Sequence, residues 1–126
     1  MPGDRKGRGD FGEEAACAFL KRQHYKPLVR NYRSRWGEID LVCRHKGVLV
    51  FVEVKARSPE SWGSPAEAVT PSKQRRILRT AMAYLEEIKL QDMPVRFDVV
   101  EVFLKSSGPP ECHLIPAAFE LTRRNS

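Results

Sequence analysis

The sequence contains no apolar run that approaches the roughly 18 residues of a membrane-spanning helix. Its first residues, MPGDRKGRGDFGEE, also lack the apolar segment of about 7 to 15 residues that defines a secretory signal peptide. Only three cysteines are present, with no CxxC pair, and the three histidines do not complete a zinc pattern. We therefore expect a cytoplasmic protein with reduced thiols and without a membrane segment.

Acidic residues are missing from two parts of the chain. Residues 21–35 contain six Lys or Arg and no Asp or Glu, and residues 73–79 contain four and none. Over the whole chain, 22 Lys and Arg stand against 16 Asp and Glu, which gives a net charge of +6. Such a charge balance favours a polyanionic partner, so nucleic acid is the expected one, although a basic run is also typical of a plain solvated surface.

The chain is short and ordinary in composition. It has 126 residues, of which 41% are hydrophobic and 30% charged, as expected for one folded domain with one catalytic or binding site at most. Residues 1–10 are rich in Gly, Arg and Lys, and we expect a flexible basic arm there. The domain is then expected to span residues 11–126.

Local patterns predict an α/β fold with the element order α-β-β-β-α-β. The capping-box spacing of Asp10 and Glu13 starts the first helix, and Thr70 followed by Pro71 starts the second. The two helices cover about residues 11–24 and 70–89, and the strands cover 27–35, 38–44, 48–55 and 95–104. Because the second helix separates the last two strands, that connection is a parallel crossover, and the central sheet is expected to be mixed with helices flanking it.

The two middle strands form a hairpin that closes at Lys46 and Gly47. This turn pairs residues whose numbers add up to 93, which sets Asp40 opposite Glu53 on one face of the sheet. Two carboxylates directly opposite each other are destabilising unless a positive group lies between them, and a hard cation such as Mg²⁺ accepts carboxylate oxygens. The pattern therefore predicts that Asp40 and Glu53 bind Mg²⁺ or Mn²⁺.

The same register sets Glu38 opposite Lys55, on the same face as Glu53. That pair fits an exposed structural ion pair. Lys55 also fits a catalytic role, in which it positions the attacking water or offsets negative charge that develops on phosphate. In the first helix, Glu13 faces the body of the protein; a metal or metal-water ligand and a helix-capping residue are both open interpretations.

The segments GEIDLV at 37–42, FVEVKAR at 51–57 and VTPSKQ at 69–74 resemble the YraN-like family of uncharacterised bacterial proteins. Members are predicted endonucleases, similar to archaeal Holliday-junction resolvases of the restriction-endonuclease-like superfamily. The resemblance implies a restriction-endonuclease-like core with Asp40 as the first catalytic carboxylate. It also implies that Glu53 and Lys55 form the Glu-x-Lys pair and that a helical glutamate, Glu13 by geometry, completes the set.

The expected function is a metal-dependent nuclease that hydrolyses phosphodiester bonds in branched or structured DNA. RNA remains the alternative substrate, and a non-cleaving nucleic-acid-binding accessory protein that retains the nuclease fold is the alternative function. A four-way junction would favour a homodimer by symmetry. Polar residues of the second helix and basic residues before the hairpin are the expected contacts with nucleic acid: Lys73, Gln74, Arg76, Arg33 and Arg35.

Overall fold

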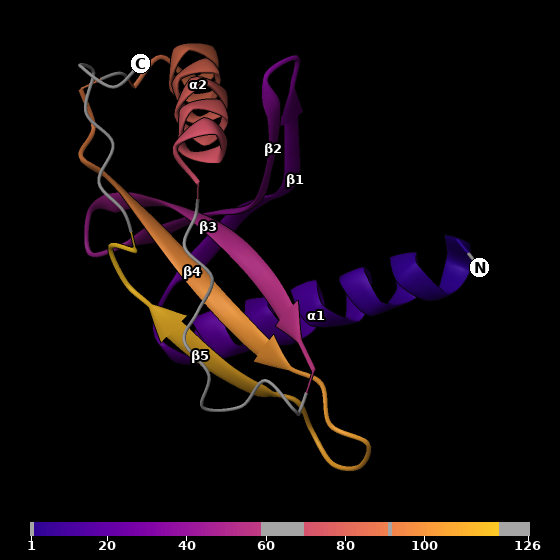
Figure 1. Ribbon diagram of the computed structural model, residues 1–126. Coiled ribbons are helices and arrows are strands. Elements are labelled where there is room, and N and C mark those ends of the chain that lie inside the picture. The colour runs from indigo at the N-terminus through magenta and orange to yellow at the C-terminus, as the bar shows by residue number, and fades with distance from the viewer. Residues whose placement is uncertain (1, 59–69, 91, 119–126) are drawn as a thin grey trace.

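The computed structural model describes residues 2–58, 70–90 and 92–118, and their side chains from residue 11 onward. The described residues form two helices and five strands, with three strands after the first helix and two after the second (Figure 1). Their bounds are α1 (Pro2–Arg22), β1 (Lys26–Ser34), β2 (Gly37–His45), β3 (Val48–Arg57), α2 (Pro71–Ile88), β4 (Val95–Phe103) and β5 (Glu111–Ile115). The predicted α/β class is confirmed.

The strands form one sheet in the order β1-β2-β3-β4-β5. Strands β3 and β4 run parallel, and the other three neighbouring pairs are antiparallel, so the predicted mixed sheet is confirmed. The sequence patterns did not predict β5, which is only five residues long and follows the turn at 106–110. It pairs with β4 and forms one edge of the sheet, with β1 at the other edge.

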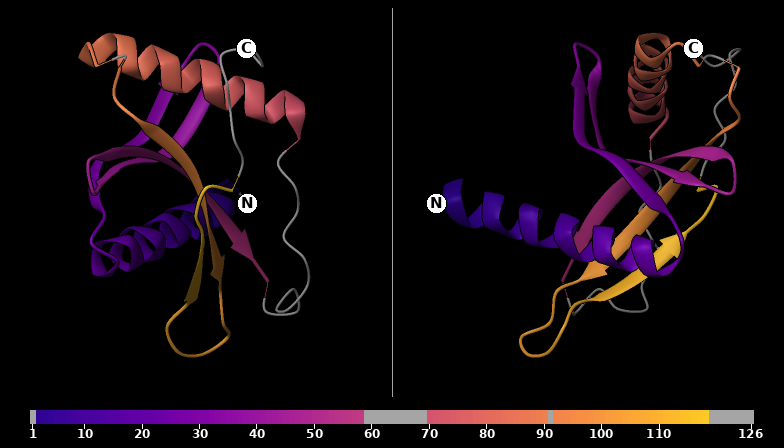
Figure 2. Two further views of the ribbon diagram at one scale, coloured as in Figure 1. Left: turned by 90° about the vertical axis from the view of Figure 1, so that its left-hand side faces the viewer. Right: turned by 180° about the vertical axis from the view of Figure 1, so that it is seen from behind.

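The two helices cover opposite faces of the sheet (Figures 1 and 2). On one face, α2 packs its Ile77, Leu78 and Leu85 on Phe51 and Phe97 of the central strands. On the other face, α1 packs on a second cluster that contains Leu20, Leu41, Val50, Val52 and Val100. Because both faces are buried, β3 and β4 have long apolar runs, as expected for parallel strands between two layers of helix.

The start of α2 follows its local signals. Thr70 is the N-cap, and its side chain accepts a hydrogen bond from the backbone N–H of Lys73, with Pro71 at the first helical position. The helix ends at Lys89, which adopts the left-handed conformation. The predicted N-cap is confirmed, and the N-terminal turn of α2 is held at the edge of the central strands.

The first helix differs from its prediction at the N-terminal end. It begins at Pro2, so residues 2–10 continue the helix instead of forming the expected arm, and Asp10 is not a helix cap. Once the turns packed on the sheet are formed, each further residue adds a hydrogen bond without a new nucleus, which extends the helix despite its glycines. Glu13 therefore lies inside the helix and is not needed for capping. The loop expected at 56–69 lies mostly outside the described residues.

The hairpin register is confirmed where the two strands pair. Residues 41–45 of β2 pair with residues 48–52 of β3, so that partner numbers add up to 93. The described ladder ends at Leu41 and Val52, and at this point the ribbon of β1 and β2 turns away from β3 and rises beside α2 (Figure 1). The strands therefore separate next to Asp40 and Glu53, and both helices can place side chains near the opening.

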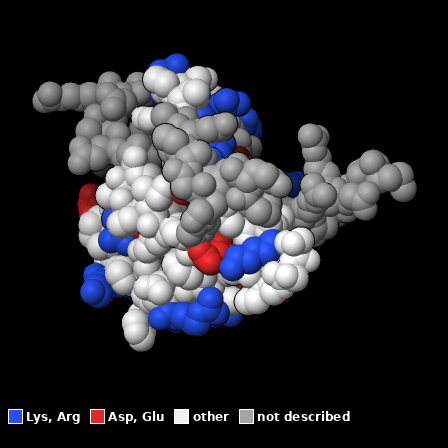
Figure 3. Space-filling view, turned by 60° about the horizontal axis from the view of Figure 1, so that its bottom comes forward, with Lys and Arg blue, Asp and Glu red and all other residues white. Residues whose placement is uncertain are grey.

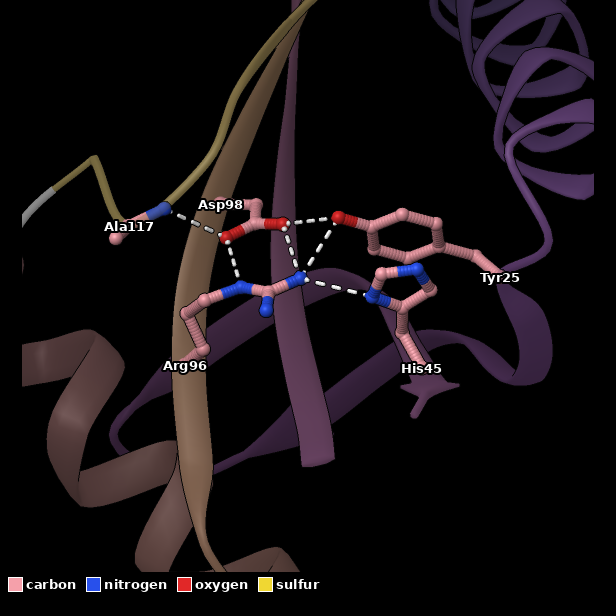
Figure 4. Close-up of polar contacts among 5 residues, drawn as sticks. All are labelled: Tyr25, His45, Arg96, Asp98 and Ala117. Carbon is pink, nitrogen blue, oxygen red and sulfur yellow. Dashed lines mark hydrogen bonds and ion pairs between the residues drawn. The ribbon is translucent and has the colours of Figure 1, made fainter. Parts of the chain in front are cut away.

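A buried polar cluster ties four segments together at the opposite end of β2 (Figure 4). Asp98 on β4 is 1% exposed, and both of its carboxylate oxygens accept hydrogen bonds. The donors are the hydroxyl of Tyr25 (2.8 Å), the guanidinium of Arg96 and the backbone N–H of Ala117 (2.8 Å). His45 stacks on Tyr25 with 4.1 Å between ring centroids. The cluster fixes the chain beyond β5 to the sheet.

Candidate metal and nucleic-acid site

Three carboxylates meet where β2 leaves β3. Glu38 and Asp40 belong to β2, and Glu13 reaches them from the middle of α1. One oxygen atom of each lies within 4.8 Å of the others, which is close enough for a single cation to contact all three. The structure thus places two predicted residues, Asp40 and Glu13, in one group, and adds Glu38 to them.

Glu13 is held in place by the edge strand β1. The side-chain amide of Asn31 donates to Glu13 Oε2 at 3.0 Å. Arg30 lies 4.0 Å from the same oxygen and makes its closer contact, 2.9 Å, with Glu14. These contacts hold the Glu13 carboxylate beside Asp40 and Glu38. Asn31 therefore positions Glu13, and Glu13 does not act as a helix cap.

Asp40 is partly buried and lies among negative charges. Burial, partly offset by the hydrogen bond that Val54 N–H donates to Asp40 Oδ2 (2.8 Å), raises the pKa of Asp40 to about 6. The nearby carboxylates of Glu53, Glu13 and Glu38 contribute to this rise in the pKa, in that order. The site therefore concentrates negative charge in a poorly hydrated place, which is the electrostatic condition for binding a cation.

Glu53 is the second predicted metal ligand, and the structure gives it a basic partner. Its Oε1 forms an ion pair with the ammonium group of Lys73, from the first turn of α2. Its other carboxylate oxygen, Oε2, is buried and has no hydrogen-bond partner among the described residues. A buried acceptor without a partner costs free energy, so Glu53 is poised to accept a further donor or a cation.

A cavity of about 280 Å³ opens beside these groups. Polar residues on one side and apolar residues from the sheet and α2 on the other form its wall: Glu38, Ile39, Asp40, Phe51, Val52, Glu53, Lys73, Ile77 and Asp98. Asp98 is engaged by Tyr25, Arg96 and Ala117, whereas the carboxylates of Glu38, Asp40 and Glu53 line the cavity.

Lys55 lies on β3 two residues after Glu53, and it is half-buried. Its Cα is paired with that of Glu101 on β4. The predicted cross-strand partner of Lys55 was Glu38, but Glu38 instead pairs with Arg33 of β1 at 3.3 Å. The difference arises because the pairing of β2 with β3 stops at Leu41, so that β1 becomes the nearer neighbour of Glu38.

The predicted contacts with nucleic acid lie on two adjoining elements. Lys73, Gln74 and Arg76 occupy the first two turns of α2, while Arg33 and Arg35 lie at the end of β1. The elements touch through a hydrogen bond of 3.2 Å between the hydroxyls of Ser34 and Thr80. Basic side chains also form several groups on the face that Figure 3 shows, with acidic ones at fewer points. Together, the two elements place positive charge beside the acidic cavity.

Sequence reasoning missed three of these relationships. Glu38 was assigned to an ion pair because the bend of β2 has no local signature. Asn31 adopts a left-handed backbone conformation (φ 54°) inside a strand, which Asn tolerates better than most residues, but this does not show in a periodic pattern. Lys73 follows Pro71 by two residues, so the sequence places it in the first turn of the helix. This position is compatible with contact with the cavity, but it does not identify Glu53 as the partner.

Comparison with known proteins identifies the family. Residues 12–102 match Uncharacterised protein family UPF0102. The chain belongs to this family. It is 50% identical over 111 residues to a UPF0102 protein of Symbiobacterium thermophilum, covering 88% of this chain and 94% of the relative. It is 44% identical over 118 residues to a UPF0102 protein of Geotalea daltonii, covering 94% and 93%. The resemblance to a family of uncharacterised bacterial proteins is thereby confirmed.

A UPF0102 protein of Geobacter sulfurreducens is 44% identical over 113 residues, covering 90% of this chain and 88% of the relative. The matches include α1 from Gly12 through most of β4, and so all of the carboxylates described above. In the parts of this UPF0102 chain that the structure describes, no helix has the length and apolar character needed to cross a membrane.

Proposed function

We propose that this UPF0102 protein is a metal-dependent nuclease that hydrolyses phosphodiester bonds in DNA. The observation that carries the proposal is the convergence of Glu13, Glu38 and Asp40 beside a cavity with positive charge at its margin. A structural ion-pair network would match each carboxylate with a cation. Here Glu38 and Glu13 have arginine neighbours, Arg33 at 3.3 Å and Arg30 at 4.0 Å, but Asp40, which lies beside them, has no basic side chain among its described contacts.

The residues present fit Mg²⁺ or Mn²⁺. Both ions prefer hard oxygen ligands, and Glu13, Glu38 and Asp40 offer carboxylate oxygens close together. The buried, unpartnered Oε2 of Glu53 is a further acceptor next to them. A bound divalent cation would offset the repulsion that raises the pKa of Asp40, polarise the scissile phosphate and acidify a bound water.

The protein's own side chains would hold the ion, position the attacking water and contact the substrate phosphate. Asp40 and Glu38 hold the ion from β2, and Glu13 holds it from α1. Lys55, on the same face of β3 as Glu53, positions the attacking water or donates to the negative charge that develops on phosphate. Lys73 is placed to exchange its contact with Glu53 for one with a phosphate oxygen of the substrate.

DNA with a branch or another departure from the duplex is the substrate class that we propose. The net charge of +6 and the basic margin of the cavity support a nucleic acid. The resemblance to Holliday-junction resolvases supports a branched one, and such a junction would suit a homodimer. The rival to this proposal is a protein that binds the same DNA and does not cut it.

A cleavage screen tests the proposal. Purified protein is incubated with four-way, flap, duplex and single-stranded DNA and with single-stranded RNA, with Mg²⁺, Mn²⁺ or EDTA. We expect cleavage of a branched or structured DNA only with metal, and a loss of at least about 10² in rate in Asp40→Asn while DNA binding persists. The matched control is Glu86→Gln, an equally conservative change on the exposed side of α2.

Two results would overturn the proposal. The first is DNA binding by the wild-type protein without cleavage of any substrate under either metal, which would favour the non-cleaving accessory protein. The second is an Asp40→Asn variant that cleaves at the wild-type rate, which would show that a different site, or a contaminant, does the chemistry.

A further inference from the structure

An exposed tryptophan at the tip of the β1–β2 hairpin lies between two arginines. The guanidinium carbon of Arg35 lies 4.5 Å from the centroid of the Trp36 ring, and that of Arg79, from α2, lies 4.8 Å from it. Trp36 is 36% exposed, which is unusual for a large aromatic residue, and both arginines are exposed. Three side chains from two elements thus form one surface group, which we call the Trp36 clamp.

The backbone under the clamp is fixed by its own contacts. The N–H of Trp36 donates to Ser34 Oγ at 3.0 Å, and the Ser34 hydroxyl is hydrogen-bonded to Thr80 of α2. Thr80 in turn donates to the backbone carbonyl of Arg76 at 2.8 Å. These contacts do not involve the indole ring, whose described contacts are with the guanidinium groups of Arg35 and Arg79. The exposed part of the ring is therefore accessible to a partner.

The clamp holds positive charge without a protein counter-charge. Each guanidinium carbon lies within 5 Å of the same ring centroid, so the two cations are at most about 9 Å apart, and each repels the other. Across the described residues, no carboxylate forms an ion pair with Arg35, Arg76 or Arg79, while the neighbouring Arg33 is paired with Glu38. Stacking on an aromatic face orients the planar guanidinium groups and leaves their N–H donors directed to solvent.

We propose that Arg35, Trp36 and Arg79 bind the sugar-phosphate backbone of the nucleic acid. Guanidinium groups match phosphate oxygens with paired hydrogen bonds, and fixing them on a ring lowers the entropy lost on binding. The choice of nucleic acid as the partner rests on the proposed function, because Arg79 lies on the same helix as Lys73, which lines the acidic cavity. From Lys73 at the cavity to Arg79 the axial rise along α2 is about 9 Å, with Arg76 midway.

The arrangement favours a nucleic acid over an acidic protein as the partner. Lys73, Arg76 and Arg79 follow one another at intervals of three residues, so they form a stripe on one side of α2. Arg35 extends the stripe from the hairpin. A regular line of cations suits the repeating charge of a phosphodiester strand, and the clamp would hold that strand about 9 Å along α2 from Lys73.

Metal-free DNA binding tests the clamp separately from catalysis. Fluorescently labelled four-way and duplex DNA is titrated in EDTA over a series of salt concentrations with wild type, the double variant Arg35→Ala/Arg79→Ala, Trp36→Ala and Trp36→Phe. The matched control is Lys21→Ala/Arg44→Ala, which also removes two exposed charges, one of them at the far end of β2. Circular dichroism melting confirms that each variant is folded.

We expect the double clamp variant to bind at least about tenfold more weakly and to flatten the salt slope by about one to two, since up to two phosphate contacts are lost. Trp36→Ala should bind more weakly with all charges retained, and Trp36→Phe should recover most of the loss. The control should bind as the wild type does. The inference is overturned if the wild type binds no DNA, if the control weakens binding as much as the clamp variant does, or if Trp36→Ala binds normally.

The outcomes separate this inference from the proposed function. Cleavage by the wild type together with unchanged binding by the clamp variants would overturn the clamp and keep the nuclease. Weakened binding by the clamp variants together with no cleavage by the wild type would keep the clamp and overturn the nuclease. A clamp that binds an acidic peptide in competition with DNA, and more tightly, would also overturn the choice of partner.

Discussion

The side-chain amide of Asn31 donates a hydrogen bond of 3.0 Å to the carboxylate of Glu13, and so connects the edge strand of the sheet to the helix that supplies a metal ligand. Asn31 reaches this position because its backbone is left-handed, a conformation that Asn and Gly adopt at low cost. The contact fixes the Glu13 carboxylate, one oxygen of which lies within 4.8 Å of carboxylate oxygens of Asp40 and Glu38.

Removing that amide should weaken the metal site without unfolding the protein. Asn31→Gly keeps the left-handed backbone and deletes only the donor, so we expect Mn²⁺ affinity to fall by about tenfold, as is typical when a group that orients a metal ligand is lost. Isothermal titration calorimetry with Mn²⁺ measures the effect. Wild-type affinity in Asn31→Gly would show that Glu13 needs no support, or that it binds no metal.

The raised pKa of Asp40 predicts how stability depends on pH in the absence of metal. Because the pKa is about 6 in the folded protein against an ordinary value of 3.8, the folded state binds the proton more tightly. This contribution to stability is fully present below about pH 4 and is lost as the pH rises through about 6. The shift corresponds to at most about 3 kcal/mol.

Asp40→Asn should abolish that pH dependence, since an amide stays neutral and can still accept the hydrogen bond from Val54. Urea unfolding in EDTA between pH 4 and 7 compares the two proteins. We expect the variant to be more stable than the wild type at pH 7 and similar to it at pH 4. Parallel curves for the two proteins would show that Asp40 is not the titrating group. Millimolar Mn²⁺ at pH 7 should stabilise only the wild type.

Lys73 should affect metal and DNA in opposite directions. Its ammonium group is paired with Glu53, so Lys73→Met removes a cation that competes with a metal ion for the same carboxylate. We expect Mn²⁺ affinity to rise several-fold. DNA affinity in EDTA should fall, with a salt slope flatter by about one, because one phosphate contact is lost. A fall in both affinities would instead assign Lys73 to holding the fold together.

Replacing Lys55 by Ala distinguishes a catalytic role of its side chain from a structural one. If Lys55 only takes part in an ion pair at a wet surface, Lys55→Ala should cost less than about 1 kcal/mol of stability and leave cleavage intact. If it positions water or stabilises charge on phosphate, cleavage should fall by about 10² or more while folding and Mn²⁺ binding persist. Single-turnover cleavage on the substrate found in the screen decides between the two.

Local sequence signals correctly predicted the structural features that are determined by residues close together in the chain. The alternation in residues 38–44 and 48–55 and the turn at Lys46 and Gly47 gave the correct register of the hairpin. Thr70 and Pro71 gave the correct start of α2. In both cases, strand periodicity or capping chemistry acts within a few residues and leaves a readable pattern.

Features that depend on distant contacts were not predictable. The position of Glu38 beside Asp40 and Glu13 requires that the part of β2 before Leu41 separate from β3 and that α1 lie beside it, and no pattern in β2 encodes either arrangement. The extension of α1 to Pro2 runs against its glycines. The candidate site was therefore predicted in its residue types, whereas the choice of the third carboxylate came from tertiary structure.

The irregular course of β1 has a further consequence for how the protein behaves in solution. As an outer strand, β1 presents an unpaired row of backbone groups, which is a template for pairing with another chain. Its pairing with β2 shifts register between Pro27 and Val29, Asn31 turns the backbone left-handed, and Arg30 is exposed on the strand. Proline, a break in register and exposed charge each discourage sheet growth at an edge. The same distortion that aims Asn31 at Glu13 therefore protects the molecule from edge-to-edge aggregation.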